Sequence, residues 1–297
     1  MIPAFVNPRS GNAEAARAAL TAAGGFDIRE VEPATLAEHV RLAVDRGAGR
    51  IVVAGGDGSI GSVANVIAGT GTELGILPCG TLNHLAKDLG LPLDLERAAV
   101  VARHGSAAPV DAAVVNDRIF LNTSSVGAYV SFVRARERLE RRLGYAVASL
   151  VAGVRLLLRM PTFAVTLQAN GVQRRYVTPL VFIGVGEREL KLPTLGARVA
   201  GGKTGLHVMV VRRRSGGRAL ALGLAAATKG VRAVAKTPAL DAFIVDQVRV
   251  EPHVPRIAVD GEIATVTPPL HYRHVPGHLR VVVRPGDVAR DVEKFND

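Results

Sequence analysis

The residues with the clearest potential for chemistry lie in the segment Gly55-Gly56-Asp57-Gly58-Ser59, which follows the apolar run 51–54. A helical pattern of apolar residues begins directly after it, over 60–68. Glycines allow positive φ and bring a ligand close to bare backbone, and the free N–H groups of a helix N-terminus attract anions. The segment predicts a strand, a turn and a helix that bind phosphate, with Asp57 in the turn beside phosphate or Mg²⁺. An ordinary structural turn fits this segment alone equally well.

Two further polar turns follow predicted strands. Asn7-Pro8-Arg9-Ser10-Gly11-Asn12 comes after a strand over 2–6, and Ser10 could add a hydrogen-bond donor. Pro78-Cys79-Gly80-Thr81-Leu82-Asn83-His84 comes after a strand over 73–78. Thr81 and Asn83 could contact a ligand or cap the following helix. Because ligands bind beyond the carboxyl ends of parallel strands, we expect the three turns to converge on one phosphate-binding edge.

A second group of reactive residues is Val259-Asp260-Gly261-Glu262, late in the chain. Glu262 is the better candidate for a general base, and Asp260 could orient it or hold a metal ion. Asp-Gly is also a common hairpin turn, and on these residues alone that structural interpretation is favoured.

The elements that must position these residues change character near residue 109. Residues 1–108 repeat a strand–turn–helix unit, which predicts an α/β nucleotide-binding domain with a doubly wound, mostly parallel sheet. Residues 109–297 contain short strands joined by turns such as Asn116-Asp117 and Asn170-Gly171, which predict an all-β domain with a β-sandwich and a helical insertion over 129–159. The last residues could pack back on the first domain.

The charge is unevenly distributed along the chain. The 297 residues have a formal net charge of +11, but residues 1–100 carry 8 Lys or Arg against 11 Asp or Glu. The basic second part suggests an anionic partner. Aromatic residues make up only 4% and Trp is absent, so stacking platforms for nucleic acid are scarce and we favour an anionic membrane surface.

The basic residues of the insertion lie on a predicted helix over 129–143, beside a more apolar helix that ends at residue 160. Such a pair could lie on a lipid surface, and a solvated face over packed helices is an equal alternative. The basic residues of that helix are Arg134, Arg136, Arg138, Arg141 and Arg142.

The expected location is the cytoplasm, with peripheral attachment to the inner membrane face. The single cysteine, Cys79, allows no intrachain disulfide and fits a reducing compartment. We find no signal-peptide pattern at the start and no apolar run of about 20 residues, the length of a membrane span.

Four motifs, in their order and rough spacing, resemble the diacylglycerol kinase catalytic domain family, and in particular its small bacterial lipid kinases. Gly-Gly-Asp-Gly is shared with NAD kinases, whereas the Gly-Thr-x-Asn-x-x-Ala segment together with the late Asp-Gly-Glu is specific to the lipid kinases. The four motifs are residues 7–11, 55–59, 78–86 and 259–262.

The resemblance implies an ATP-dependent lipid kinase with an N-terminal nucleotide-binding domain, a C-terminal β-sandwich and an active site between them. It implies that Asn7, the loop from Gly55 to Ser59, and Thr81 bind ATP. Asp57 would serve the phosphate–Mg²⁺ centre, and Glu262 would take the proton from the lipid hydroxyl.

Two positions depart from the family pattern. Gly202-Lys203-Thr204-Gly205-Leu206 replaces an acidic turn that helps hold a secondary Mg²⁺, so this metal site stays open and Lys203 could replace the cation's charge. Glu30 stands near the place of a threonine that lies close to the adenosine.

Alternatives to a lipid kinase are a soluble-substrate kinase of the NAD kinase type and a non-catalytic lipid or nucleotide binder. The acceptor lipid, diacylglycerol or another, stays open, as does assembly into a homodimer.

Overall fold

The computed structural model describes residues 1–127, 162–190, 195–199, 201–211, 240–252 and 256–284, with scattered residues between 130 and 151. It divides into two compact units. Unit 1 comprises Met1–Ala112 and the segment from Val275 onward, and unit 2 comprises Ala113–His274. Much of the helical insertion expected over 129–159 lies outside the described residues.

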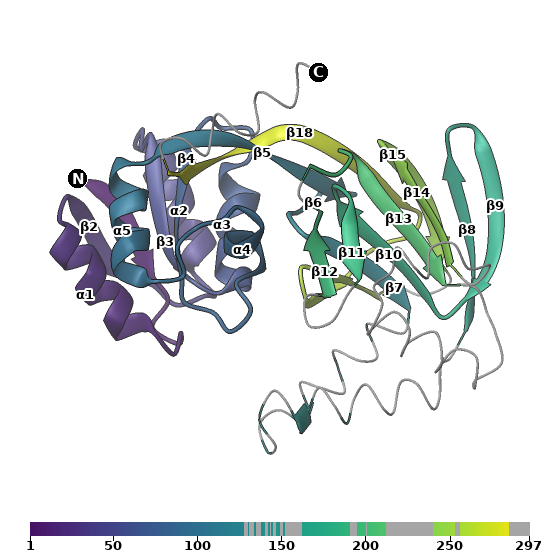
Figure 1. Ribbon diagram of the computed structural model, residues 1–297, viewed down its shortest axis with the longest axis horizontal. Coiled ribbons are helices and arrows are strands. Elements are labelled where there is room, and N and C mark those ends of the chain that lie inside the picture. The colour runs from purple at the N-terminus through teal and green to yellow at the C-terminus, as the bar shows by residue number, and fades with distance from the viewer. Residues whose placement is uncertain are drawn as a thin grey trace. The chain divides into compact units, whose positions relative to one another are not determined.

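Unit 1 alternates strands and helices along the chain (Figure 1). Its successive elements are β1 (Ile2–Val6), α1 (Ala13–Ala23), β2 (Phe26–Glu30), α2 (Leu36–Asp45), β3 (Arg50–Gly55), α3 (Asp57–Ile67), β4 (Glu73–Pro78), α4 (His84–Asp88) and α5 (Leu95–His104).

The strands of unit 1 pair in parallel. β1 lies between β2 and β3, and β4 lies beside β3, with Val53 opposite Ile76. β18 (Leu270–Val283) begins in unit 2 and ends in unit 1, where Arg280 lies opposite Glu73 of β4. The predicted mostly parallel sheet is confirmed.

Helices cover both faces of this sheet because its central strands are apolar on both faces. Val52 and Ala54 of β3 pack with Leu20 of α1 and Ala98 of α5 in one core cluster. The alternate side chains of β3 are also buried, and α3 packs on that strand and against α2. The helix pairs α1–α5 and α2–α3 therefore sandwich the sheet.

Unit 2 is built from antiparallel strands. The strands that begin before residue 200 are β5 (Ser106–Val115, which starts in unit 1), β6 (Arg118–Phe120), β7 (Thr123–Gly127), β8 (Phe163–Ala169), β9 (Val172–Thr178), β10 (Leu180–Val185), β11 (Arg188–Leu190) and β12 (Leu195–Arg198). The later strands are β13 (Leu206–Val211), β14 (Leu240–Val245), β15 (Gln247–Pro252), β16 (Arg256–Val259), β17 (Glu262–Thr265) and the first half of β18.

Most of these strands form two layers, while β11 and β12 pair in a separate two-stranded sheet. One sheet has the order β14-β13-β10-β7-β16-β17, and the other layer contains β18-β15-β8-β9 with β5 and β6. The predicted hairpins are present, since Asn116 and Asn170 take positive φ at their turns. The predicted all-β second part is confirmed.

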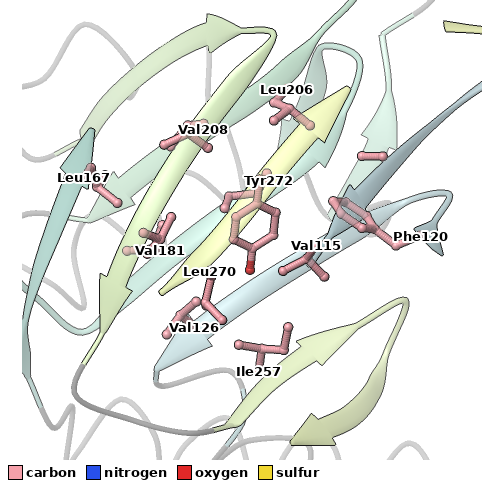
Figure 2. Close-up of a cluster of buried hydrophobic side chains, with 14 of the residues drawn as sticks. Val115, Phe120, Val126, Leu167, Val181, Leu206, Val208, Ile257, Leu270 and Tyr272 are labelled. Atoms are coloured by element: carbon pink, nitrogen blue, oxygen red, sulfur yellow. The ribbon is translucent and has the colours of Figure 1, made fainter. Parts of the chain in front are cut away.

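The core of unit 2 lies between its two layers, and Figure 2 labels Tyr272 together with core side chains from both layers. Tyr272 is fully buried, and its ring meets Phe120 edge-on at a centroid distance of 6.0 Å. Its hydroxyl shares a hydrogen bond of 3.0 Å with the Ser124 hydroxyl, so the polar tip of this large ring is satisfied.

Among the described helices, none combines the length and apolar character needed to span a bilayer.

Candidate functional site

The three polar turns of unit 1 meet at the carboxyl edge of its parallel sheet. The Asn7 side-chain amide donates to the Ser59 hydroxyl at 3.1 Å, joining the first turn to α3. The Ser10 hydroxyl donates to the Cys79 carbonyl oxygen at 2.7 Å, joining the first turn to the third. Polar turns that are remote in sequence therefore form one connected surface, which we call the three-turn site (residues 7–10, 55–59 and 79–83).

Glycines allow two of these turns to touch through their backbones. A Cβ atom on Gly80 would lie 2.7 Å from the Gly56 Cα, and one on Gly55 would lie 2.6 Å from the Ser59 Cβ. Both distances are shorter than ordinary carbon contacts. Any side chain at Gly55 or Gly80 would therefore force the site apart.

Asp57 is the first residue of α3, with Gly56 as the N-cap, so it does not lie within the turn as the sequence analysis expected. The helix therefore begins three residues before the predicted start at residue 60. One carboxylate oxygen, Oδ1, is buried and has no hydrogen-bond partner among the described residues. Buried acceptors are normally satisfied, so this oxygen has unused capacity for a donor or a cation.

Asn83 closes its own turn. Its Oδ1 accepts from the Gly80 N–H at 2.9 Å, and its Nδ2 donates to the Gly80 carbonyl oxygen at 2.8 Å. The residue takes left-handed φ of 50° and makes no side-chain cap to α4. Asn83 thus shapes the turn, whereas Thr81 is exposed beside it.

Cys79 is buried beneath the three-turn site. Burial raises the pKa of its thiol to about 11, although its contact with Ser10 acts in the opposite direction. A thiol of this kind is largely protonated at neutral pH and is a weak nucleophile.

Asp260 forms a hairpin turn between β16 and β17, with φ of 47° and Gly261 at 88°. Its carboxylate is buried and accepts three backbone N–H groups, from Leu121 at 2.8 Å and from Asn122 and Thr123 at 2.9 Å. Both oxygens are engaged by the backbone, which favours an orienting role over metal binding. The sequence could not reveal this, because the donors lie about 140 positions earlier.

The buried Arg188 carries a positive charge that acts on Asp260, and the sequence alone did not indicate it. Burial raises the pKa of Asp260, whereas the three N–H groups and the positive charge of Arg188 act in the opposite direction. Arg188 is only 3% exposed. Arg188 follows Glu187 and is the first residue of the short strand β11. Nothing in this local sequence indicates that the guanidinium is buried.

Glu262 follows this turn as the first residue of β17, and its side chain is 59% exposed. The Arg118 guanidinium lies 3.6 Å from its carboxylate. Glu262 therefore presents an ionisable oxygen to solvent, as a general base for an external hydroxyl must.

The turn over 202–206 contains no carboxylate of its own, but the Glu187 carboxylate from another segment contacts it. Glu187 accepts from the Lys203 N–H at 3.1 Å, and its own N–H donates to the Lys203 carbonyl oxygen at 2.9 Å. Within the described ranges, no three His, Cys, Asp or Glu side chains gather as metal ligands. The other departure, Glu30, pairs with Arg17 at 2.9 Å.

The chain was compared with known proteins, and residues 2–115 match the diacylglycerol kinase catalytic domain family. A probable lipid kinase YegS-like from Cronobacter sakazakii is 35% identical over 162 residues, which are 52% of this chain and 53% of that protein. A protein of the same description from Pseudomonas putida is 33% identical over 166 residues, 54% of this chain and 55% of its own. The chain thus matches about half the length of these curated relatives.

Solved structures share the fold along almost the whole chain. A putative diacylglycerol kinase from Bacillus anthracis superposes with a TM-score of 0.74 over 97% of this chain and 98% of its own, at 21% identity. A second diacylglycerol kinase structure from that organism gives a TM-score of 0.69 at 19% identity, with the same coverage. The predicted fold class is confirmed.

Proposed function

Because residues 2–115 match the diacylglycerol kinase catalytic domain, as the sequence resemblance suggested, we propose that this chain is a lipid kinase that transfers the γ-phosphoryl group of ATP to a lipid hydroxyl. The observation that carries the proposal is the three-turn site of unit 1. Phosphoryl transfer depends mainly on positioning phosphates and neutralising their charge, and glycine turns at a helix N-terminus suit this task.

The residues of the three-turn site fit a Mg²⁺–nucleotide. A carboxylate in the first turn of α3 would repel a bare phosphate, whereas Mg²⁺ is commonly held by one or two carboxylates together with substrate phosphates. The unpartnered Oδ1 of Asp57 is such a ligand, and the backbone of residues 55–59 would bind the phosphates. Bound Mg²⁺ would supply neutralisation of the phosphate charge.

The adjoining side chains would orient the nucleotide. Asn7 and Ser59 hold each other by their hydrogen bond, and Ser10 is tied to the Cys79 carbonyl oxygen. These bonds fix the turns before the nucleotide binds, so binding loses little additional conformational entropy of the turns. Thr81, exposed at the same site, is available to contact ATP.

Glu262 would accept the proton of the lipid hydroxyl as that oxygen attacks the γ-phosphorus, while the bond from the γ-phosphorus to the bridging oxygen breaks and ADP leaves. An exposed carboxylate can take up a proton and release it to solvent after transfer. Asp260 would not take part in proton transfer, because both of its oxygens are bonded to backbone N–H groups. We propose that the acceptor lies in a membrane that attracts the basic second part of the chain.

The test is transfer of label from γ-labelled ATP in the presence of Mg²⁺ and mixed-lipid vesicles, with a parallel reaction that contains NAD and no vesicles. We expect a labelled lipid, and a drop of about 10²- to 10⁴-fold for Glu262→Gln, the range typical of a general base. Glu251→Gln, an exposed carboxylate of the same unit, is the control and should keep full activity.

Three outcomes would contradict the proposal. Labelled NADP without labelled lipid would indicate a soluble-substrate kinase. Nucleotide binding without transfer to any lipid would indicate a non-catalytic binder. Unchanged transfer by Glu262→Gln would remove Glu262 from the reaction.

A further inference from the structure

Arg188 is an almost wholly buried positive charge in unit 2 that the proposed reaction leaves without a role. Its Nε donates to the Val185 carbonyl oxygen at 2.8 Å and its Nη2 to the Leu121 carbonyl oxygen at 3.3 Å. Arginine is rarely buried to this degree unless it is paired. An apolar side chain of the same volume would have a lower desolvation cost, so stability alone does not explain why an arginine occupies this position.

The surrounding structure is shaped to hold this side chain. A Cβ atom on Gly184 would lie 2.4 Å from the Arg188 Cγ, so the stem of the arginine crosses β10 where glycine leaves room. The Arg188 N–H donates to His207 Nδ1 at 3.0 Å, which ties its backbone to β13. Side chain and backbone are thus both fixed within unit 2.

The fixed guanidinium acts on the turn that carries Glu262. Arg188 donates to the Leu121 carbonyl oxygen, while Asp260 accepts from the Leu121 N–H at 2.8 Å, so both charged groups hold the same residue. The positive charge of Arg188 also interacts electrostatically with the buried Asp260 carboxylate. Glu262 begins β17 two residues later, opposite Val259.

We infer that Arg188 is a positioning residue, which fixes the Asp260 turn and through it the direction of the Glu262 carboxylate. The inference rests on the proposed function, in which Glu262 takes the proton of the acceptor hydroxyl. On the exposed side, the Arg118 guanidinium lies 3.6 Å from the Glu262 carboxylate. Arg188 itself is too deeply buried to touch a substrate.

The test compares Arg188→Met, which removes the charge, with Arg188→Lys, which keeps it. Arg249→Met is the matched control, because Arg249 is a half-exposed arginine of the same unit on β15. For Arg188→Met we expect kcat for lipid phosphorylation to fall about 10- to 100-fold, the usual effect of losing a group that supports a reacting one. The KM for ATP should stay unchanged, since the three-turn site lies in unit 1. Arg188→Lys should recover part of kcat.

A second readout does not depend on activity. In ¹⁵N-labelled protein, the backbone amide signals of Asp260 and Glu262 should shift in Arg188→Met and stay in place in Arg249→Met. Circular dichroism gives the folded fraction, to which every kcat is corrected. If Arg188→Met does not fold, the same two measurements on Arg188→Lys carry the test.

The inference is overturned if corrected kcat is unchanged, if kcat and the KM for ATP change together, or if the Asp260 and Glu262 amide signals stay in place. Failure of the wild type to phosphorylate any lipid would refute the proposed function instead. The amide signals would then still decide whether Arg188 fixes the Asp260 turn.

Discussion

Replacing Gly80 with alanine should separate two turns of the three-turn site. A Cβ atom at this position would lie 2.7 Å from the Gly56 Cα and 2.9 Å from the Asn83 Oδ1. Carbon atoms are in favourable contact at about 3.5–4.0 Å, so the turns must part by about 1 Å. The neighbour at Gly56 is backbone, so no side-chain rotation can relieve the clash.

Two effects of known size follow from this displacement. Overpacking of this kind costs about 1–3 kcal/mol of the free energy of unfolding. A shift of about 1 Å in groups that position a substrate can lower kcat/KM about 100-fold. We therefore expect a lower urea midpoint and much weaker binding of Mg²⁺–ATP by isothermal titration calorimetry.

Gly61→Ala is the matched control, since a Cβ atom there meets nothing within 4 Å and Gly61 lies inside α3. Alanine in a helix interior should raise the free energy of unfolding by about 0.5–1 kcal/mol and leave ATP binding intact. Wild-type stability and wild-type ATP affinity in Gly80→Ala would refute the packing of these turns and their role in nucleotide binding.

Four further predictions concern single residues. Asp57→Asn should lose the Mg²⁺-dependent part of ATP affinity, measured by titration with and without the metal, and equal losses in both would contradict a role at the cation. Burial lowers the pKa of His207, so below about pH 6.5 the unfolded chain takes up a proton more readily than the native protein, and stability falls with decreasing pH. The urea midpoint should therefore fall less between pH 7.5 and pH 5 in His207→Asn than in the wild type. An equal fall in both proteins would disprove this. The thiol of Cys79, whose pKa burial raises to about 11, should react at least about 10-fold more slowly with a disulfide reagent in native than in denatured protein, and equal rates would contradict its burial. Gly127→Ala would place a Cβ atom 2.5 Å from the Pro179 carbonyl oxygen at a φ of 102°, so calorimetry should find the protein destabilised by about 2–5 kcal/mol, and an unchanged melting temperature would refute that packing.

The sequence predicted the α/β part well because its signals are local. The apolar run before Gly55 predicts a strand buried on both faces, and β3 is buried along almost its whole length. The strands predicted over 2–6 and 73–78 coincide with β1 and β4. The convergence of the three turns followed from the general rule that parallel strands end at one edge.

The supports of the Glu262 corner could not be predicted, because they come from segments remote in sequence. The sequence around Asp260 predicts a hairpin turn, and the structure has one, but the N–H groups that its carboxylate accepts lie in the connection between β6 and β7 and at the start of β7. Arg188 gives no sequence signal because arginine in a short strand normally faces solvent. The Glu187 carboxylate at the turn around Lys203 could not be predicted either, because it comes from a segment 16 residues earlier in the chain.

We propose that Glu262 of unit 2 takes the proton of the acceptor hydroxyl while residues 55–59 of unit 1 hold the nucleotide. Mn²⁺–ATP in place of Mg²⁺–ATP tests it directly, because the paramagnetic ion broadens the NMR signals of nearby nuclei. In ¹⁵N-labelled protein with bound acceptor lipid, we predict broadening of the Gly56, Asp57 and Glu262 amide signals and a sharp Gly171 signal. Broadening confined to unit 1, with an unchanged Glu262 signal, would contradict the account.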